Sequence, residues 1–130
     1  MLTWAKRFSM RTGSEHEKLT VYGRALDLAT MLDAISTEIP ERRADLRDQL
    51  RRASASIVLN LAEGAGEFSP GDKARFYRMA RRSASECAAI LDLLERTTPL
   101  AKMVERARPG IQEVGAMLTA LVKGLEKRPR

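Results

Sequence analysis

The sequence contains one cysteine, Cys87, and one histidine, His16, among its 130 residues. A single thiol cannot form an internal disulfide or a four-ligand zinc site, and it fits a reducing cytoplasm. A lone histidine in a polar stretch leaves a Ser-His-Asp triad or a histidine metal cluster without its parts. No apolar run approaches the ~20 residues of a membrane span. We therefore expect a cytoplasmic protein that is not an enzyme, needs no cofactor or metal and does not enter a membrane.

Aromatic residues are also scarce, at 5% of the chain. The abundant residues are alanine, leucine, arginine and glutamate, which favour helices and disfavour strands. A chain of this length fits one domain that can bury a core without cross-links. Composition therefore predicts a single all-α domain.

Four apolar seams with alternating spacings of three and four residues predict four helices packed in a bundle. The seams are Val21, Ala25, Leu28, Leu32, Ile35 and Ile39; Leu46, Leu50, Ala53, Ile57 and either Asn60 or Leu61; Phe76, Ala80, Ser83, Cys87, Ile90 and Leu94; and Val104, Ala107, Ile111, Val114, Leu118, Leu121 and Leu125.

Breaks between the seams are short. Pro40 ends the first helix, Gly64 ends the second, and Ser69 followed by Pro70 caps the third. Pro109 either bends the fourth helix or divides it. The pattern predicts an antiparallel up-down-up-down bundle over residues 19–126, with a flexible arm at residues 1–18 and a basic tail at residues 127–130.

Polar residues interrupt two of the seams and predict a network between the second and third helices. They are Ser56, Asn60 and Glu63 on the second helix and Ser83 and Glu86 on the third. Because buried polar groups need partners, such a network sets the helix register. The two carboxylates could also lie close together and form an enzymatic or metal site, but the structural role is favoured because no histidine accompanies them.

These residues resemble a known family. The segments Ser56-Ile57, Asn60-Leu-Ala-Glu-Gly64 and Phe76-x-x-x-Ala80-x-x-Ser83-x-x-Glu86 are similar to a pattern found in small bacterial four-helix bundles. Those proteins were first noticed as reading frames in intervening sequences of 23S rRNA genes. The resemblance covers about residues 19–126, with Arg82 at a position where the family usually has glycine. It implies a non-enzymatic bundle assembled as a homopentameric ring. It also implies distant kinship with accessory subunits of diversity-generating reverse transcriptases, which bind nucleic acid and the polymerase.

Function is expected on the surface, where basic residues outnumber acidic ones by 23 to 17. Arginines favour bidentate contacts with phosphates, and stripes of them favour a polyanionic partner. The candidate nucleic-acid-binding residues are Arg43, Arg47, Arg51, Arg78, Arg82, Lys123, Lys127 and Arg128. Without interleaved aromatics, binding to RNA or DNA should use backbone phosphates and not base stacking. Pairing of the arginines with Asp45 and Asp48 is the alternative explanation of the stripe on the second helix.

The leading hypothesis is an oligomeric protein that binds RNA or an RNA/DNA substrate, with a reverse transcriptase as an expected protein neighbour. The alternative is a protein-protein interaction scaffold with no nucleic-acid role. Four apolar residues off the seams, Leu59, Met79, Leu93 and Met117, predict buried contacts between subunits under either hypothesis.

Overall fold

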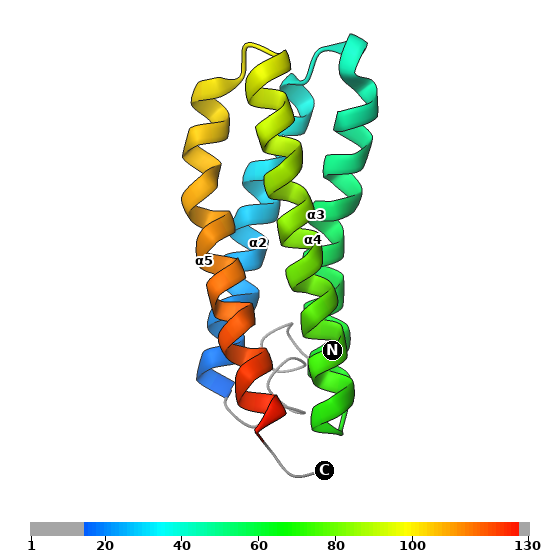
Figure 1. Cartoon of the computed structure of the whole chain (residues 1–130), viewed down its shortest axis with the longest axis vertical. Coiled ribbons are helices and arrows are strands. Elements are labelled where there is room, and N and C mark those ends of the chain that lie inside the picture. Colours follow the sequence, from blue (N-terminus) through cyan, green and yellow to red (C-terminus); the bar gives the residue numbers. More distant parts are fainter. Residues whose placement is uncertain (1–14, 128–130) are drawn as a thin grey trace, which may run out of the picture.

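The computed structural model describes residues 15–127, which form an antiparallel bundle of four long helices (Figure 1). The helices are α2 (Glu15–Glu38), α3 (Ala44–Gly66), α4 (Pro70–Thr97) and α5 (Ala101–Glu126), and a 3-10 helix, η1 (Glu41–Arg43), leads into α3. No strand occurs within residues 15–127, so the predicted all-α four-helix bundle is confirmed. Most of the predicted arm (residues 1–14) and of the basic tail (residues 128–130) lies outside the described residues.

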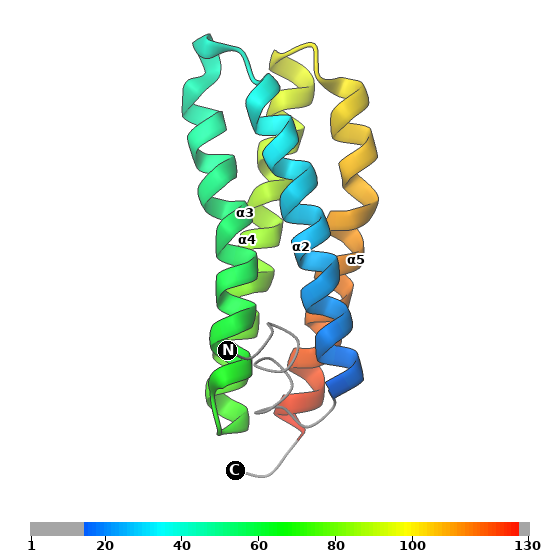
Figure 2. The same cartoon turned by 180° about the vertical axis from the view of Figure 1, so that it is seen from behind.

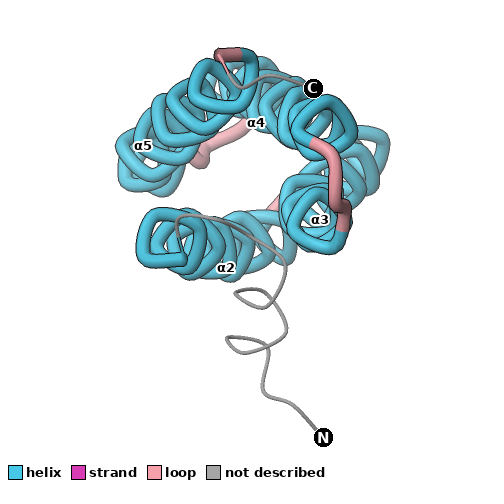
Figure 3. The backbone as a smooth tube through the Cα atoms, turned by 90° about the horizontal axis from the view of Figure 1, so that it is seen from below, coloured by secondary structure: helices cyan, strands magenta, loops and turns pink. Residues whose placement is uncertain are grey.

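The helices follow one another around the bundle, so each packs against its two neighbours in sequence, and α5 closes on α2 (Figure 3). The α2–α3 and α4–α5 connections lie at one end, and the α3–α4 connection lies at the other (Figure 1). From behind, α2 lies between α3 and α5 (Figure 2). No helix in the described part of the chain is long and apolar enough to cross a membrane.

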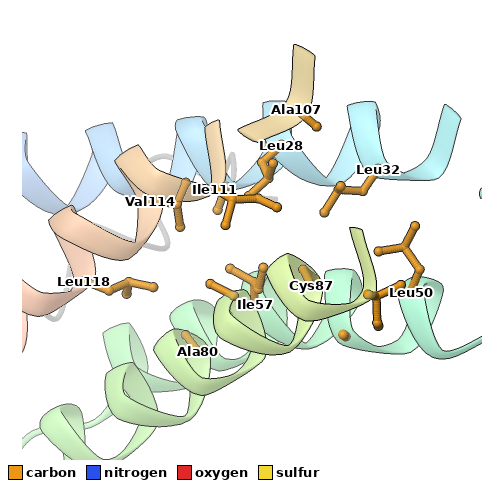
Figure 4. Packing of buried hydrophobic residues seen from close by; sticks show 14 of the residues in the cluster. Leu28, Leu32, Leu50, Ile57, Ala80, Cys87, Ala107, Ile111, Val114 and Leu118 are labelled. Atoms are coloured by element: carbon orange, nitrogen blue, oxygen red, sulfur yellow. The ribbon is translucent and has the colours of Figure 1, made fainter. Parts of the chain in front are cut away.

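The core is a continuous apolar column to which all four helices contribute (Figure 4). Every seam residue predicted for α2 and α5 is buried, and the α3 seam continues through Leu61, while Asn60 is only half-buried. Burial of an aliphatic side chain contributes roughly 1.5–3 kcal/mol, so these seams hold the bundle together. Met117, which the sequence suggested as an outer contact, is partly buried and packs against this core.

Helix boundaries follow the local signals at two of the breaks. α2 ends at Glu38, two residues before Pro40. The hydroxyl of Ser69 accepts a hydrogen bond of 3.1 Å from the backbone N–H of Asp72, which caps α4.

Two other boundaries differ from the prediction. α2 already begins at Glu15, so its first turn includes the last four residues of the predicted arm. α3 continues past Gly64 to Gly66, because Gly64 and Ala65 are both buried and keep the last turn packed against the core.

Pro109 does not divide the fourth helix, since α5 is one element from Ala101 to Glu126. Proline removes one backbone hydrogen bond and disfavours a helix interior. Ala107 before it and Ile111 after it are both buried in the same core. Packing on both sides of the proline therefore keeps the helix continuous.

The facing predicted for α4 is partly wrong. Ala80, Cys87, Ile90 and Leu94 are buried as expected, but Phe76 and Ser83 are only half-buried. Their neighbours Tyr77 and Ala84 are buried in their place. α4 packs against both α3 and α5, so its buried arc is wider than one seam, and tertiary contacts choose which residues occupy it.

Candidate nucleic-acid interface

The arginine row predicted on the second helix starts in η1 and runs into α3, and its first member is paired. The guanidinium of Arg43 donates to both carboxylate oxygens of Asp45, with Nε–Oδ1 and Nη2–Oδ2 distances of 3.2 Å. This hydrogen bonding raises the pKa of Arg43 and lowers the pKa of Asp45. A bidentate carboxylate already occupies the geometry that a phosphate would use.

The next two members of the row also have partners. Arg47 lies 2.8 Å from a carboxylate oxygen of Glu41 and 3.5 Å from one of Asp48, and the hydrogen bond to Glu41 is the main cause of its raised pKa. Nε of Arg51 donates to the hydroxyl of Ser36 on α2, at 3.0 Å. The alternative explanation, pairing with nearby acids, therefore accounts for Arg43 and Arg47, while the partner of Arg51 is a neutral hydroxyl.

Basic residues on the lower half of α4 and α5 have few acidic neighbours. Residues 75–82 of α4 contain four arginines and no acid. Arg78 lies 3.2 Å from Glu126, so the carboxyl end of α5 runs beside this segment (Figure 1). Five side chains on this side, Arg78, Arg81, Arg82, Lys123 and Lys127, are here named the α4–α5 basic patch. Glu126 is the one acid in the same turns of the two helices, so most of the charge of the patch is not neutralised.

The other half of the α4–α5 side is different. Arg108 on α5 contacts Asp92 at 2.9 Å and Glu95 at 3.4 Å, both on α4. These hydrogen bonds raise the pKa of Arg108, with the bond to Asp92 as the larger cause. Acidic residues therefore balance the upper half of this side, and net positive charge is confined to the lower half.

The members of the patch differ in exposure. Arg78, Arg82, Lys123 and Lys127 are exposed, and Arg81 is half-buried. Arg75 is not included in the patch because its guanidinium lies 4.7 Å from the centroid of the Phe76 ring, a cation-π contact on the α3 side. Arg128, the last predicted phosphate contact, lies outside the described residues.

Three of the five predicted network residues come together between α3 and α4. The hydroxyl of Ser83 lies 2.8 Å from that of Ser56. The side-chain amide of Asn60 donates to the carbonyl and to the hydroxyl of Ser56, both at 2.9 Å. This Ser56-Asn60-Ser83 cluster ties the two helices together at one level.

Glu63 and Glu86 do not join this cluster, which corrects the prediction for both. Each side chain is exposed. The Ser56–Ser83 contact sets the register of the antiparallel pair, so Glu63 lies seven residues towards one end and Glu86 three residues towards the other. At about 1.5 Å per residue, the two carboxylates stand roughly 15 Å apart along the bundle. They cannot share one metal ion or one substrate atom.

Sequence reasoning missed a lysine in the first turn of α4 that lies against the carboxyl end of α3. Lys73 is only 5% exposed, and its Nζ lies 3.5 Å from the carbonyl oxygen of Gly64 and 3.4 Å from that of Ala65. A cation at the carboxyl end of a helix meets the carbonyls that have no partner in the helix. Ala74, Tyr77 and Ala84, at spacings of three and seven residues, gave the one sequence signal for this buried side of α4.

Catalytic and metal-binding groups are sparse in the described chain. Residues 15–127 contain no group of three or more histidine, cysteine, aspartate or glutamate side chains placed to hold a metal ion. Burial, together with the nearby charge of Glu86, raises the pKa of Cys87 to about 12. The thiol is therefore protonated at neutral pH and is a poor nucleophile.

The family model described as "23S rRNA-intervening sequence protein" matches residues 17–120. The matched range includes α2 except its first two residues, all of α3 and α4, and most of α5. It therefore contains the Ser56-Asn60-Ser83 cluster and the three arginines of the basic patch, but it ends before Lys123. No curated protein matches the chain.

Proposed function

The chain belongs to the family of 23S rRNA-intervening sequence proteins, and we propose that it is a non-catalytic, oligomeric protein that binds nucleic acid through the α4–α5 basic patch. The observation that carries this proposal is the charge distribution. Five basic side chains lie around one acid on the lower half of α4 and α5, while Arg43 and Arg47 of the η1–α3 row are paired with acids.

The patch suits backbone phosphates. Neutralising a phosphate releases condensed counterions, so this mode of binding weakens as the salt concentration rises. No aromatic side chain belongs to the patch, so it has no platform for stacking bases. Binding should therefore depend on phosphate spacing and helix shape, with little preference for base sequence.

Assembly would strengthen this binding. The proposed oligomer is a ring of five, as the family resemblance implies, and it carries a formal charge of five times +6, or +30. Five patches on one particle bind a long polyanion with avidity. RNA or an RNA/DNA hybrid in the cytoplasm is the proposed partner, and a reverse transcriptase is the proposed protein neighbour.

The second candidate function is a protein-protein scaffold with no nucleic-acid role. It is favoured by the exposure of large apolar side chains, among them Leu59 at 63% and Leu93 at 47%. Apolar residues in these positions suit a protein partner better than a phosphate backbone.

The two functions are separated by the salt dependence of binding. The probe is a fluorescently labelled RNA duplex of about 25 base pairs, titrated by anisotropy at several salt concentrations. Arg78→Gln combined with Arg82→Gln should weaken binding and lower the log-log salt slope by about 1 for each lost phosphate contact.

Arg47→Gln combined with Arg51→Gln is the matched control, because it removes the same charge from side chains that already have partners. It should leave affinity and slope close to those of the parent. The proposal is wrong if the parent does not bind at 50 mM salt. It is also wrong if the control weakens binding as much as the patch variant. The mass of each variant, measured by light scattering, shows whether assembly is intact.

A further inference from the structure

On the outer side of α3 and α4, two exposed apolar side chains lie beside the polar Ser56-Asn60-Ser83 cluster. Leu59 on α3 is 63% exposed and Met79 on α4 is 42% exposed. The backbone carbonyl of Met79 lies 3.1 Å from the Ser83 hydroxyl, which places Met79 next to the Ser56-Asn60-Ser83 cluster. Leu59 directly precedes Asn60. Exposed apolar side chains bordered by polar groups are typical of a protein contact, which has an apolar centre and a polar rim.

Four charged residues surround this centre. Arg52 and Glu63 lie on α3, and Arg75 and Glu86 lie on α4, all of them exposed. None of the four forms an ion pair within the described residues. We name the surface made by these four residues with Leu59 and Met79 the α3–α4 face.

The Ser56–Ser83 hydrogen bond shows which charges lie at the same height. Arg52 is four residues before Ser56, and Glu86 is three residues after Ser83, so both lie about 5 Å to one side of the contact. Glu63 and Arg75 lie on the other side, at about 11 Å. Of these four residues, each helix thus carries one positive and one negative, and the order of the two signs from one end of the bundle to the other is opposite on the two helices.

Such an arrangement is complementary to itself. If a second copy is turned about a two-fold axis parallel to the helices, its Glu86 meets Arg52 and its Arg75 meets Glu63. If the axis is instead perpendicular to the helices, Arg52 meets Glu63 of the copy, and Arg75 meets Glu86. Both rotations bring opposite charges together and place Leu59 and Met79 at the middle of the contact.

We propose that the α3–α4 face binds the same face of a second copy of this chain in a two-fold contact. The choice of a second copy rests on charge complementarity, because a surface of this pattern is matched by itself. The α4–α5 basic patch lies on the side of α4 that faces α5, and α5 and α3 lie on opposite sides of α4 (Figure 3). Arg82 is exposed on α4 three residues after Met79, so it borders the α3–α4 face, and we count it with the patch.

This inference rests on the self-association in the proposed function and not on nucleic-acid binding. A two-fold contact uses the same surface on both partners, so it joins chains in pairs and cannot by itself close a ring of five. Within the proposed assembly, it links a chain of one ring to a chain of another. Without ring formation, it gives a dimer.

The first test substitutes the apolar centre. Leu59→Lys brings two positive charges into the middle of the contact and removes two apolar side chains from it, so the self-association constant, measured by sedimentation equilibrium, should fall by about tenfold to a hundredfold. Met31→Lys is the matched control, because Met31 on α2 is 42% exposed and lies away from this face. It should leave the constant unchanged. Equal effects of the two variants would overturn the proposal.

The second test reverses charges in pairs. Arg52→Glu alone should weaken association by about tenfold, since a two-fold contact contains each substitution twice. Adding Glu86→Arg restores association if the axis is parallel to the helices, and adding Glu63→Arg restores it if the axis is perpendicular. Restoration by either partner supports the contact and identifies the axis.

Restoration by neither partner, or a parent that stays monomeric at 100 µM, overturns the contact. The RNA titration of Arg78→Gln with Arg82→Gln is read separately and at low protein concentration. Failure of the α3–α4 contact is therefore distinguishable from failure of nucleic-acid binding. A parent that forms only rings of five, with no pairing of rings, also overturns the α3–α4 contact and leaves ring assembly unaffected.

Discussion

The ring of Tyr77 lies so close to the backbone of Gly64 that a Cβ atom at position 64 would stand 2.6 Å from Cε1 of the ring. Real Cβ atoms are not found at such distances, so only glycine allows α3 and α4 to approach this closely. The same region holds Lys73 against the carbonyls at the end of α3. Gly64 is therefore needed for close packing of the two helices and not for a turn, since α3 continues past it to Gly66.

Gly64→Ala should lower the free energy of unfolding by about 1–3 kcal/mol, the usual cost of overpacking. This loss should outweigh the gain of up to about 1 kcal/mol that alanine brings to a helix. Gly115→Ala is the control, since a Cβ there meets nothing within 4 Å; it should raise stability. Urea unfolding of both variants measures the difference. A Gly64→Ala protein as stable as Gly115→Ala would contradict the close contact.

Tyr77→Phe should leave stability unchanged or raise it by about 1 kcal/mol. The hydroxyl of Tyr77 is buried without a hydrogen-bond partner among the described residues, and burial raises its pKa. An unsatisfied buried hydroxyl costs free energy that phenylalanine avoids, while the ring keeps its contacts. Thermal unfolding is the measurement. A loss of more than 1 kcal/mol would show that the hydroxyl has a partner after all.

Ser83→Ala should reduce stability by about 0.5–1.5 kcal/mol, the net contribution of one hydrogen bond between helices. Asn60→Leu should cost a similar amount, because its amide bonds Ser56 within α3 and is only half-buried. The double variant shows whether the cluster acts as one unit, in which case its loss is smaller than the two single losses combined. Additive losses in a double-mutant cycle would mean that Ser56 serves the two residues independently.

Because Cys87 is buried, we expect the free energy of unfolding to fall at alkaline pH. Its pKa is about 12 in the folded chain and near 9.0 without burial, so the unfolded thiol ionises first as pH rises. The contribution is fully present below about pH 9 and is lost as pH rises towards 12. Cys87→Ala should therefore flatten the fall in unfolding free energy between pH 8 and 10.5. If the pH dependence of the unfolding free energy were unchanged in this variant, other groups such as Tyr77 would account for the whole fall.

The thiol also provides an independent check by chemistry. Because the folded state keeps Cys87 buried and protonated, a thiol reagent at pH 8 should react with it only after unfolding. Fast labelling of the native protein would place Cys87 outside the core.

Most of the fold could be predicted from the sequence because its determinants are local. The seams of α2 and α5 repeat every three or four residues, and each lies wholly on one side of its helix, so periodicity alone identified their buried residues. Pro40 and the Ser69-Pro70 start are likewise local, since a backbone without a free N–H and a capping hydroxyl act within one turn. The helix count and the order of the helices followed from these signals.

The facing of α4 depended on tertiary structure. One residue along a helix turns the side chain by about 100°, so Phe76 and Tyr77 point in different directions, and either could continue an apolar row. Contact with both α3 and α5 selected Tyr77, and the absence of a side chain at Gly64 made room for its ring. No pattern within α4 contains that information.

Charge neutralisation was also decided by the tertiary structure. The sequence determined that Arg43, Arg47 and Arg51 recur every four residues, but not that Arg47 meets Glu41 or that Arg51 meets Ser36 on another helix. It likewise could not show that α5 brings Lys123 and Lys127 beside the arginines of α4, which Arg78 and Glu126 demonstrate. Coulomb interactions depend on distance in space and are short-ranged in salt. The sequence therefore determined how much positive charge the protein carries, and the packing of the helices decided where that charge remains unneutralised.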